Sequence, residues 1–226
     1  MLAERAKSKR ATTKDLAKTP FLFGEIRQPN RRYLAIPKTS SEGRAYIPVA
    51  FLGPEVIAAS DSFTVSGAEL FHFGVLTSHM HMAWARYVCG RLKSDYRYSA
   101  GIVYNNYPWP QDVPDTQRMA VEAAAQAVLD ARAQHPTSTL ADLYDPLAMP
   151  APLLRAHQQL DRAVDRCYRP EPFPSDRHRV EYLFALYEKL TAPLVAPAKP
   201  TRIGRLGPWC KRGGLGALGG SRLLKA

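Results

Sequence analysis

The sequence is poor in the residues that crosslink a protein or anchor it. Three cysteines, Cys89, Cys167 and Cys210, are too few and too scattered for a disulfide framework or a zinc cluster. Such scarcity is typical of a reducing compartment. No run approaches the ~20 apolar residues of a membrane span, and Met1 opens a charged stretch rather than the apolar core of a signal peptide. We therefore expect a soluble cytoplasmic protein with no membrane partner.

The usual signs of catalysis are also missing. Nucleotide-type cofactors are commonly held by a Gly-rich turn between a strand and a helix, but the run at 213–216 follows no predicted strand. The acidic residues show no paired spacing suited to acid–base work. His79 and His81 would diverge on a helix, and no third ligand is evident nearby. We expect no catalytic residue, no metal and no cofactor in this chain.

One segment, Asn106-Tyr107-Pro108-Trp109, resembles a base-holding motif. Methyltransferases that act on adenine use Asn/Asp-Pro-Pro-aromatic to hold the amino group and to stack on the flipped base. Here Tyr107 stands where the first proline belongs, and no cofactor-binding half precedes it. A structural turn that packs Trp109 between the two halves is therefore the favoured interpretation.

Charge is unevenly distributed along the chain. Lys and Arg number 31 against 20 Asp and Glu, which gives a net charge of +11. Residues 1–50 hold 11 basic and 4 acidic groups, whereas residues 201–226 hold 6 basic groups and no acidic one. A basic balance favours polyanionic partners through counterion release, although basic ends are often only solvated tails.

The pattern of apolar residues predicts an α+β protein. Short extended pieces fill the first half, interrupted by a helix from Ser78 that stops at Gly90. In the second half, apolar residues recur at helical spacing between prolines, and Met119, Ala123 and Ala127 mark one side of the first helix. The predicted strands are 33–36, 46–51, 56–59, 62–65 and 102–104, and the predicted later helices are 115–134, 153–167 and the stretch that follows 175.

The segment 91–99 mixes hydrogen-bond donors, an acceptor and aromatic residues. On an extended strand, Lys93, Asp95 and Arg97 would project from the same side. Lys can donate to guanine and Asp can accept from cytosine N4, so such a pair could contact both members of one G·C pair. The alternative is an edge strand with a solvated, charged face, and charge alone favours that alternative.

Several blocks in order make the sequence familiar. It resembles the C-terminal region of the MmeI-like (type IIL) restriction–modification and adenine methyltransferase family over about residues 20–194. The matching blocks are 36–48 (IPKTSSEGRAYIP), 81–84 (HMAW), 90–99 (GRLKSDYRYS), 104–110 (YNNYPWP), and the helical positions 157–168 and 183–191.

The resemblance implies a target-recognition domain followed by a helical domain. In the family, an upstream domain binds S-adenosylmethionine and methylates adenine N6. A Lys-x-Asp or Glu-x-Arg pair contacts a base pair near that adenine and maps onto Lys93 and Asp95, while Arg97 maps onto a neighbouring base contact. Gly43 departs from the family pattern, which usually has Arg there, and the tail after Leu194 matches nothing familiar.

We therefore expect sequence-specific binding of duplex DNA by the C-terminal portion of a methyltransferase that lacks its catalytic domain and is inactive alone. Lys93, Asp95 and Arg97 would contact bases, and four arginines would contact the DNA backbone. These are Arg31, Arg32, Arg44 and Arg91. The expected divisions are a basic segment 1–20, a recognition domain 21–110, a helical domain 111–194 and a disordered Gly/Pro-rich tail 195–226.

Two other interpretations stay open. The chain could be a separate specificity subunit that pairs with a catalytic chain, or a basic scaffold that binds DNA without sequence preference.

Overall fold

A computed structural model describes residues 2–22 and 28–195, so the expected disordered tail at 195–226 lies almost entirely outside the described residues. Residues 1–190 and 191–226 separate as two units. The chain begins with two short helices, α1 (Leu2–Ala6) and α2 (Ala11–Asp15), which are linked by a hydrogen bond from Arg5 Nη1 to the carbonyl of Leu16 at 3.0 Å. None of the described helices is long and apolar enough to cross a membrane.

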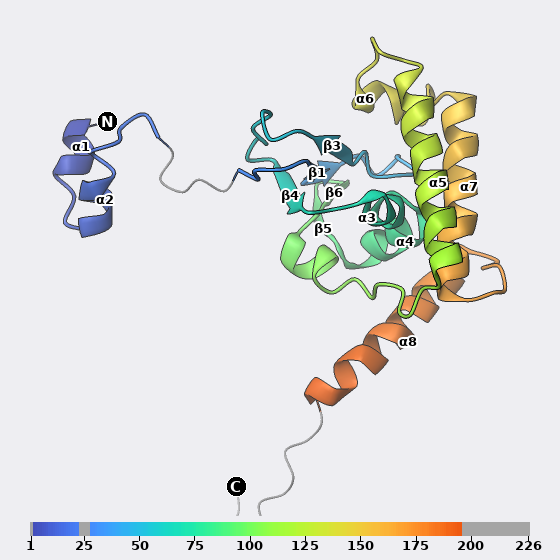
Figure 1. The fold of residues 1–226 in the computed structure, drawn as a ribbon. Helices are drawn as coiled ribbons and strands as arrows, with labels where there is room; N and C mark the ends of the chain where they lie inside the picture. The colour runs from blue at the N-terminus through green and yellow to red at the C-terminus, as the bar shows by residue number, and fades with distance from the viewer. Residues whose placement is uncertain (1, 23–27, 196–226) are drawn as a thin grey trace, which may run out of the picture. The chain divides into compact units, whose positions relative to one another are not determined.

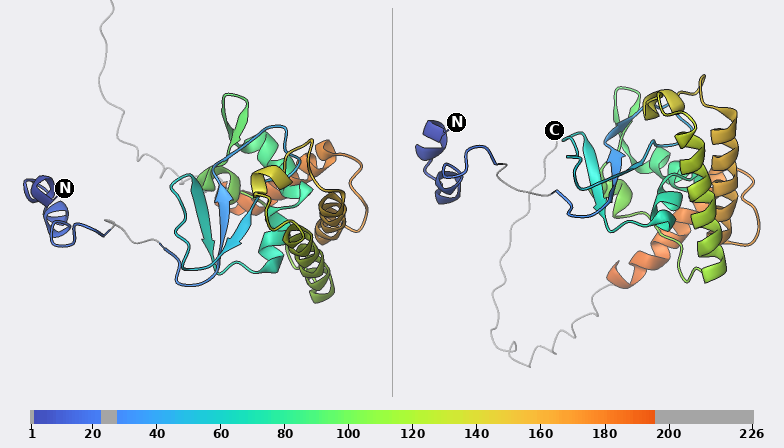
Figure 2. Two further views of the ribbon diagram at one scale, coloured as in Figure 1. Left: turned by 90° about the horizontal axis from the view of Figure 1, so that it is seen from above. Right: turned by 45° about the horizontal axis from the view of Figure 1, so that its top comes forward.

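The first sheet has three antiparallel strands in the order β3-β1-β4. The central strand β1 (Tyr33–Pro37) pairs with β3 (Ala50–Leu52) on one side and with β4 (Ser62–Ser66) on the other. β1 is almost entirely apolar (YLAIP) because its central position covers both faces, and Tyr33, Leu34 and Ile36 are almost fully buried. Figure 2 shows the three strands side by side.

Two helices follow this sheet. α3 (Leu70–Leu76) precedes α4 (His79–Val88), which begins where the Ser78 hydroxyl accepts a hydrogen bond from the His81 amide at 3.3 Å. The side chain of Trp84 is buried and donates to the carbonyl of Val103 at 3.1 Å. This bond ties α4 to η1 (Ala100–Tyr104), a π-helical turn.

A second sheet carries the segment that the sequence singles out. Its order is β2-β6-β5, with β2 (Thr39–Ser40), β5 (Gly90–Leu92) and β6 (Asp95–Arg97) all antiparallel. The strands β5 and β6 form a hairpin, coloured green, that projects from the body of the domain in the left view of Figure 2. Because β5 follows α4 directly, the position of α4 sets the base of the hairpin.

The remaining helices are α5 (Asp115–Ala133), α6 (Leu140–Leu143), α7 (Ala151–Tyr168) and α8 (Asp176–Val195). The two long helices α5 and α7 lie side by side, and α3 packs against α5 (Figure 1). One core runs through the sheets and these helices, with Leu34, Phe73 and Leu160 fully buried in it. The predicted α+β class is confirmed.

Some expected elements are wrong in detail. Residues 56–59 and 102–104 form no strand, and the second of these ranges belongs to η1. The strand expected at 46–51 is shortened to β3, and α3 has no counterpart among the predicted elements. On α5 the expected apolar side is also wrong, since Met119 is 66% exposed. The face that packs inward consists of Val121, Ala125, Val128 and Ala131.

Gly74 sets how closely α3 approaches the helices behind it. A Cβ atom at this position would lie 2.8 Å from Cγ1 of Val121 and 3.2 Å from Cδ1 of Leu160. Valine is stiff at χ1 and cannot turn its methyl group away easily. Small side chains on α5, such as Ala125, complete the close approach.

We expect Gly74→Ala to lower the free energy of unfolding by about 1–3 kcal/mol through overpacking, measured by urea denaturation. Gly101→Ala is the control: a Cβ at Gly101 meets nothing within 4 Å, so this change should not lower the free energy of unfolding. Equal stability of the two variants would contradict a tight packing of α3 on α5.

Candidate nucleic-acid interface

The β5–β6 hairpin has a two-residue turn. Leu92 pairs with Asp95, which leaves Lys93 and Ser94 as the connection. The backbone of Lys93 has φ 57°, in the left-handed region that non-glycine residues seldom adopt. Turns of this length in hairpins commonly need positive φ, because it matches the twist of the two strands. The Arg91 guanidinium supports the turn by donating to the carbonyl of Ser94 at 3.1 Å.

The second sheet has an anchored face and an exposed face. Residues that pair across antiparallel strands share a face, and successive pairs alternate. The anchored face carries Arg91, Tyr96 and Ser40. Tyr96 and Ser40 are buried, and Arg91 is exposed at the edge of this row with its guanidinium 4.1 Å from the centre of the Tyr96 ring. The opposite face carries Gly90, Leu92, Asp95, Arg97 and Thr39.

This register changes which side chains lie together. Asp95 and Arg97 share the exposed face, as the sequence predicts. Lys93 does not lie on an extended strand with them, because the turn falls at this residue. Of the two β5 residues on their face, Gly90 and Leu92, only Leu92 has a side chain, and the sequence pattern alone does not single it out. Lys93 therefore projects from the tip of the hairpin, next to that face.

Asp95 is the half-buried charged residue of this face, whereas Arg97 is exposed. The Oδ1 atom of Asp95 accepts a long hydrogen bond, 3.4 Å, from the backbone amide of Glu42. The contact brings the loop that follows β2 up to the hairpin. The other carboxylate oxygen, Oδ2, accepts no hydrogen bond from the described part of the chain and can accept from a ligand.

The four arginines expected at the DNA backbone lie in different places. Arg31 and Arg32 precede β1 on the first sheet and are exposed, with the Arg32 guanidinium 3.7 Å from the centre of the Phe51 ring. Arg44 is half-buried in the loop near the hairpin. Arg91 is exposed but also supports the hairpin turn. Arg31 and Arg32 thus belong to the first sheet, whereas Arg44 and Arg91 belong to the second sheet and the loop that follows β2.

A buried carboxylate holds the elements on either side of the second sheet. Asp161 of α7 is 9% exposed. Its Oδ2 accepts from the Tyr46 hydroxyl at 2.7 Å, and its Oδ1 accepts from the backbone amide of His79, the first residue of α4, at 2.7 Å. Burial raises the pKa of Asp161, while these two donors lower it. One side chain of the helical region thus fixes both the loop after β2 and the start of the helix that leads into β5.

A second carboxylate fixes α4 further along. Asp176, at the start of α8, accepts from His79 Nε2 at 2.7 Å and from Arg86 Nη1 at 2.6 Å. Arg179 of α8 in turn donates to both oxygens of Asp165, at 2.6 and 3.1 Å. Because His79 and Arg86 stand near opposite ends of α4, the helix is held at both ends by residues of α7 and α8.

Packing and ion pairing account for the two histidines near the start of α4. His81 is buried, and its Nε2 lies 3.0 Å from the Tyr98 hydroxyl, whereas His79 pairs with Asp176. Among residues 2–22 and 28–195, no group of three potential ligands could hold a metal ion.

The segment at 106–109 is a turn. The Asn106 amide donates to the carbonyls of Gly101 and Ile102, which closes the end of η1. Tyr107 is buried and accepts from the Tyr168 hydroxyl at 2.7 Å. It is therefore Tyr107 that bonds to the helical half, while the Trp109 ring contacts aromatic residues of the first half: His72, Tyr104 and Tyr107.

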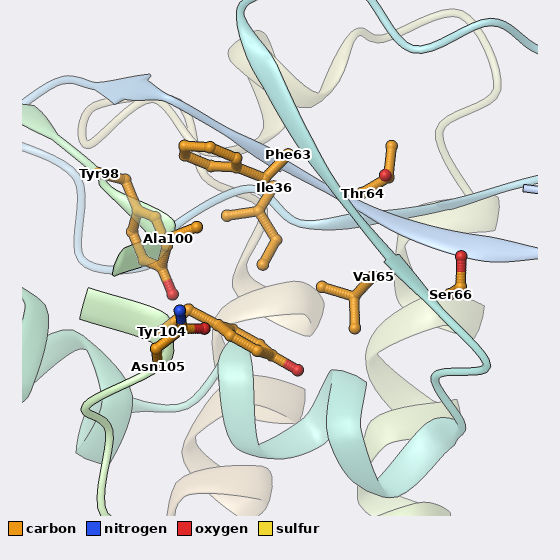
Figure 3. A pocket seen from close by; sticks show the side chains of 9 residues that line it. All are labelled: Ile36, Phe63, Thr64, Val65, Ser66, Tyr98, Ala100, Tyr104 and Asn105. Carbon is orange, nitrogen blue, oxygen red and sulfur yellow. The ribbon is translucent and has the colours of Figure 1, made fainter. Parts of the chain in front are cut away.

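A pocket of about 290 Å³ lies between the first sheet and η1. Figure 3 shows Ile36 of β1 and Val65 of β4 above it and Tyr104 of η1 below. None of its lining residues carries a cation or an acid. Its polar groups are uncharged and belong to Thr64, Ser66, Tyr98, Tyr104 and Asn105.

Two family models match the chain. They are "MmeI, target recognition domain" over residues 1–111, and "MmeI, C-terminal domain" over residues 113–195. Together they define a recognition module joined to a helical domain. The chain belongs to the MmeI-like family of type IIL restriction–modification proteins.

Two relatives support this assignment. The chain is 40% identical over 187 residues to DNA methyltransferase A of Bacillus subtilis (strain 168). The aligned region covers 83% of this chain and 21% of that protein. It also matches a solved structure of the type IIL restriction–modification enzyme MmeI in complex with DNA, with 45% identity and a TM-score of 0.76. That match covers 84% of this chain and 25% of the enzyme. The chain therefore spans about a quarter or less of these relatives.

Two buried imidazoles should make folding sensitive to acid. Burial lowers the pKa of both His81 and His157 to about 3, and the charge of Arg132 adds to the effect at His157. In the unfolded chain these groups titrate near 6.5. The unfolded state therefore binds more protons below that pH, and stability is lost as pH falls from about 6.5 towards 3.

Between pH 7 and pH 5, each histidine should cost roughly 2 kcal/mol of unfolding free energy. We expect His157→Gln to remove the contribution of His157, which is about half of the combined loss from the two histidines. Urea denaturation at both pH values measures it. His178→Gln, at an exposed position, is the control and should keep the full loss. The raised pKa of Asp161 has the opposite effect, because it makes stability rise as pH falls. Both variants retain Asp161, so the difference between their pH dependences reports the His157 imidazole. An unchanged pH dependence in His157→Gln would refute this account.

Proposed function

We propose that this chain recognises a specific sequence in duplex DNA as the C-terminal portion of an adenine-N6 methyltransferase of a restriction–modification system. The observation that carries the proposal is the hairpin, whose inner face is anchored and whose outer face presents Asp95 and Arg97 to solvent. A two-stranded ribbon fits the major groove, where each base pair has its own donor and acceptor pattern. The relation to an enzyme whose solved structure holds DNA supports this assignment.

In this proposal the hairpin contacts bases. Lys93 donates from the tip to guanine, Asp95 accepts from cytosine N4, and Arg97 contacts a neighbouring base. Asp95 uses the carboxylate oxygen that the amide of Glu42 leaves free. Lys93 and Asp95 lie two residues apart at the turn, so one base pair can engage both.

Arginines on both sides of the hairpin position the duplex through its phosphates, which carry no sequence information. They are Arg31, Arg32, Arg44 and Arg91. The proposed division assigns recognition to residues 21–110 and a supporting helical domain to residues 111–194, with basic segments at 1–20 and 195–226. The junction at Asp161 is where the helical domain supports recognition.

Methyl transfer is assigned to a part of the enzyme outside this chain. S-adenosylmethionine is the methyl donor of such enzymes and is commonly bound by a doubly wound fold with parallel strands and a Gly-rich turn. In residues 2–22 and 28–195 the strands pair only antiparallel, which does not fit that binding mode. The catalytic partner is either a covalently joined domain or a separate chain.

Exchange of charge on the hairpin tests the base contacts. The double variant Lys93→Glu, Asp95→Arg should switch the preference at one position of the bound site from G·C to C·G. A bidentate base contact is worth roughly 1–3 kcal/mol of discrimination. The full chain is used to select the duplexes that it binds from a random pool. The catalytic part is then supplied, and the site that becomes methylated is determined. An unchanged selected sequence would defeat the assignment.

Removal of phosphate contacts should change the affinity for DNA but not the sequence preference. Arg31→Ala with Arg32→Ala should weaken binding to all duplexes alike and reduce the slope of log K against log salt by about 0.9 for each phosphate that is no longer neutralised. Titrations at several salt concentrations measure this slope. Arg155→Ala, at an exposed position of α7, is the control and should keep the slope of the unaltered chain. Binding by the unaltered chain with no sequence preference would favour a non-specific scaffold instead.

A further inference from the structure

The exposed face of the hairpin contains one apolar side chain. Leu92 is 50% exposed and lies directly opposite Asp95, with Arg97 further along the same face. Single exposed leucines are common on protein surfaces, so exposure alone says nothing about function. The register is more informative, because directly opposed side chains lie about 5 Å apart at Cβ. Any molecule that Asp95 touches is therefore within reach of Leu92.

The surroundings of Leu92 favour a polyanion. Lys93 follows it at the tip, and Arg91 precedes it. The strands pair so that Arg91 turns inward onto Tyr96, while Leu92 turns outward. Leu92 thus shares the outer face with the cation of Arg97 and is followed at the turn by that of Lys93, on a two-stranded ribbon of the kind that enters the major groove. The apolar group that the major groove offers on its base edges is the 5-methyl group of thymine.

We propose that Leu92 is a specificity-determining residue that contacts the 5-methyl group of a thymine adjacent to the base pair contacted by Asp95. This inference rests on the proposed DNA recognition and extends it to a contact that needs no hydrogen bond. The Leu92 side chain excludes water from the methyl group, and burial of one such group corresponds to about a fourfold gain in affinity. Leu92 therefore favours T·A over C·G at this position without contacting polar base atoms.

Replacement of thymine by uracil tests the contact, since uracil lacks only the methyl group. The full chain is first used to select its preferred duplex, and each thymine of that duplex is then replaced in turn by uracil. For the unaltered chain, uracil at one position should weaken binding about fourfold. In Leu92→Ala the thymine and uracil duplexes should bind equally at that position, while the penalties for changing G·C pairs persist.

Leu147→Ala is the matched control, because Leu147 is 98% exposed and lies in the loop after α6. It should retain the uracil penalty of the unaltered chain. Circular dichroism of both variants should match that of the unaltered chain, since neither side chain belongs to the buried core.

The outcomes separate this inference from the proposed function. If the unaltered chain selects no sequence, both the recognition function and the thymine contact are overturned. If it selects a sequence but no thymine position is sensitive to uracil, or if Leu92→Ala keeps the same uracil penalty, only the role of Leu92 is overturned.

Discussion

The Asp161 carboxylate joins the helical half of the structure to the half that carries the hairpin. A carboxylate that is largely removed from water needs hydrogen bonds to compensate the loss of hydration. Asp161 has two donors, the Tyr46 hydroxyl and the His79 backbone amide, and they come from segments on opposite sides of the hairpin sheet. A helix of the second half therefore sets the position of the segment that is proposed to contact DNA. The two halves are coupled in folding because loss of α7 would leave these donors unpaired.

The hairpin combines an anchored face with an exposed face that makes few contacts within the described part of the chain. Tyr96 is buried beneath the exposed Arg91 side chain, so the register of β5 and β6 is determined by the burial of Tyr96. Outer residues such as Asp95 and Arg97 make few contacts within the chain, and their replacement leaves the core unchanged. This division suits a recognition element, because its specificity can change without a change of fold.

Much of the architecture follows from sequence patterns. The helix at 79–88 is predicted by its apolar spacing and by Ser78 and Gly90 at its ends, and the helices of the second half are predicted from the same periodicity. Short elements are harder to detect: α3 is nearly all apolar and has no helical period, and η1 is rich in residues that favour strands. On α5, alanines occupy several faces, so composition does not show that Val121 rather than Met119 packs inward.

For the candidate site, the sequence by itself determined the chemical groups: a basic segment, a Lys-x-Asp-x-Arg pattern and a family relation that gives the pattern a role. Only the tertiary structure decided which of these groups share a surface. The segment 91–99 has no Gly, Asn or Pro, and its turn-favouring residues Ser94 and Asp95 fit equally well into the alternation of a single strand. Its turn falls at Lys93 because Tyr96 must pair with Ser40 and face the core, a long-range constraint that local sequence does not contain. That constraint places Leu92 beside Asp95 and Arg97, and leaves Lys93 at the tip.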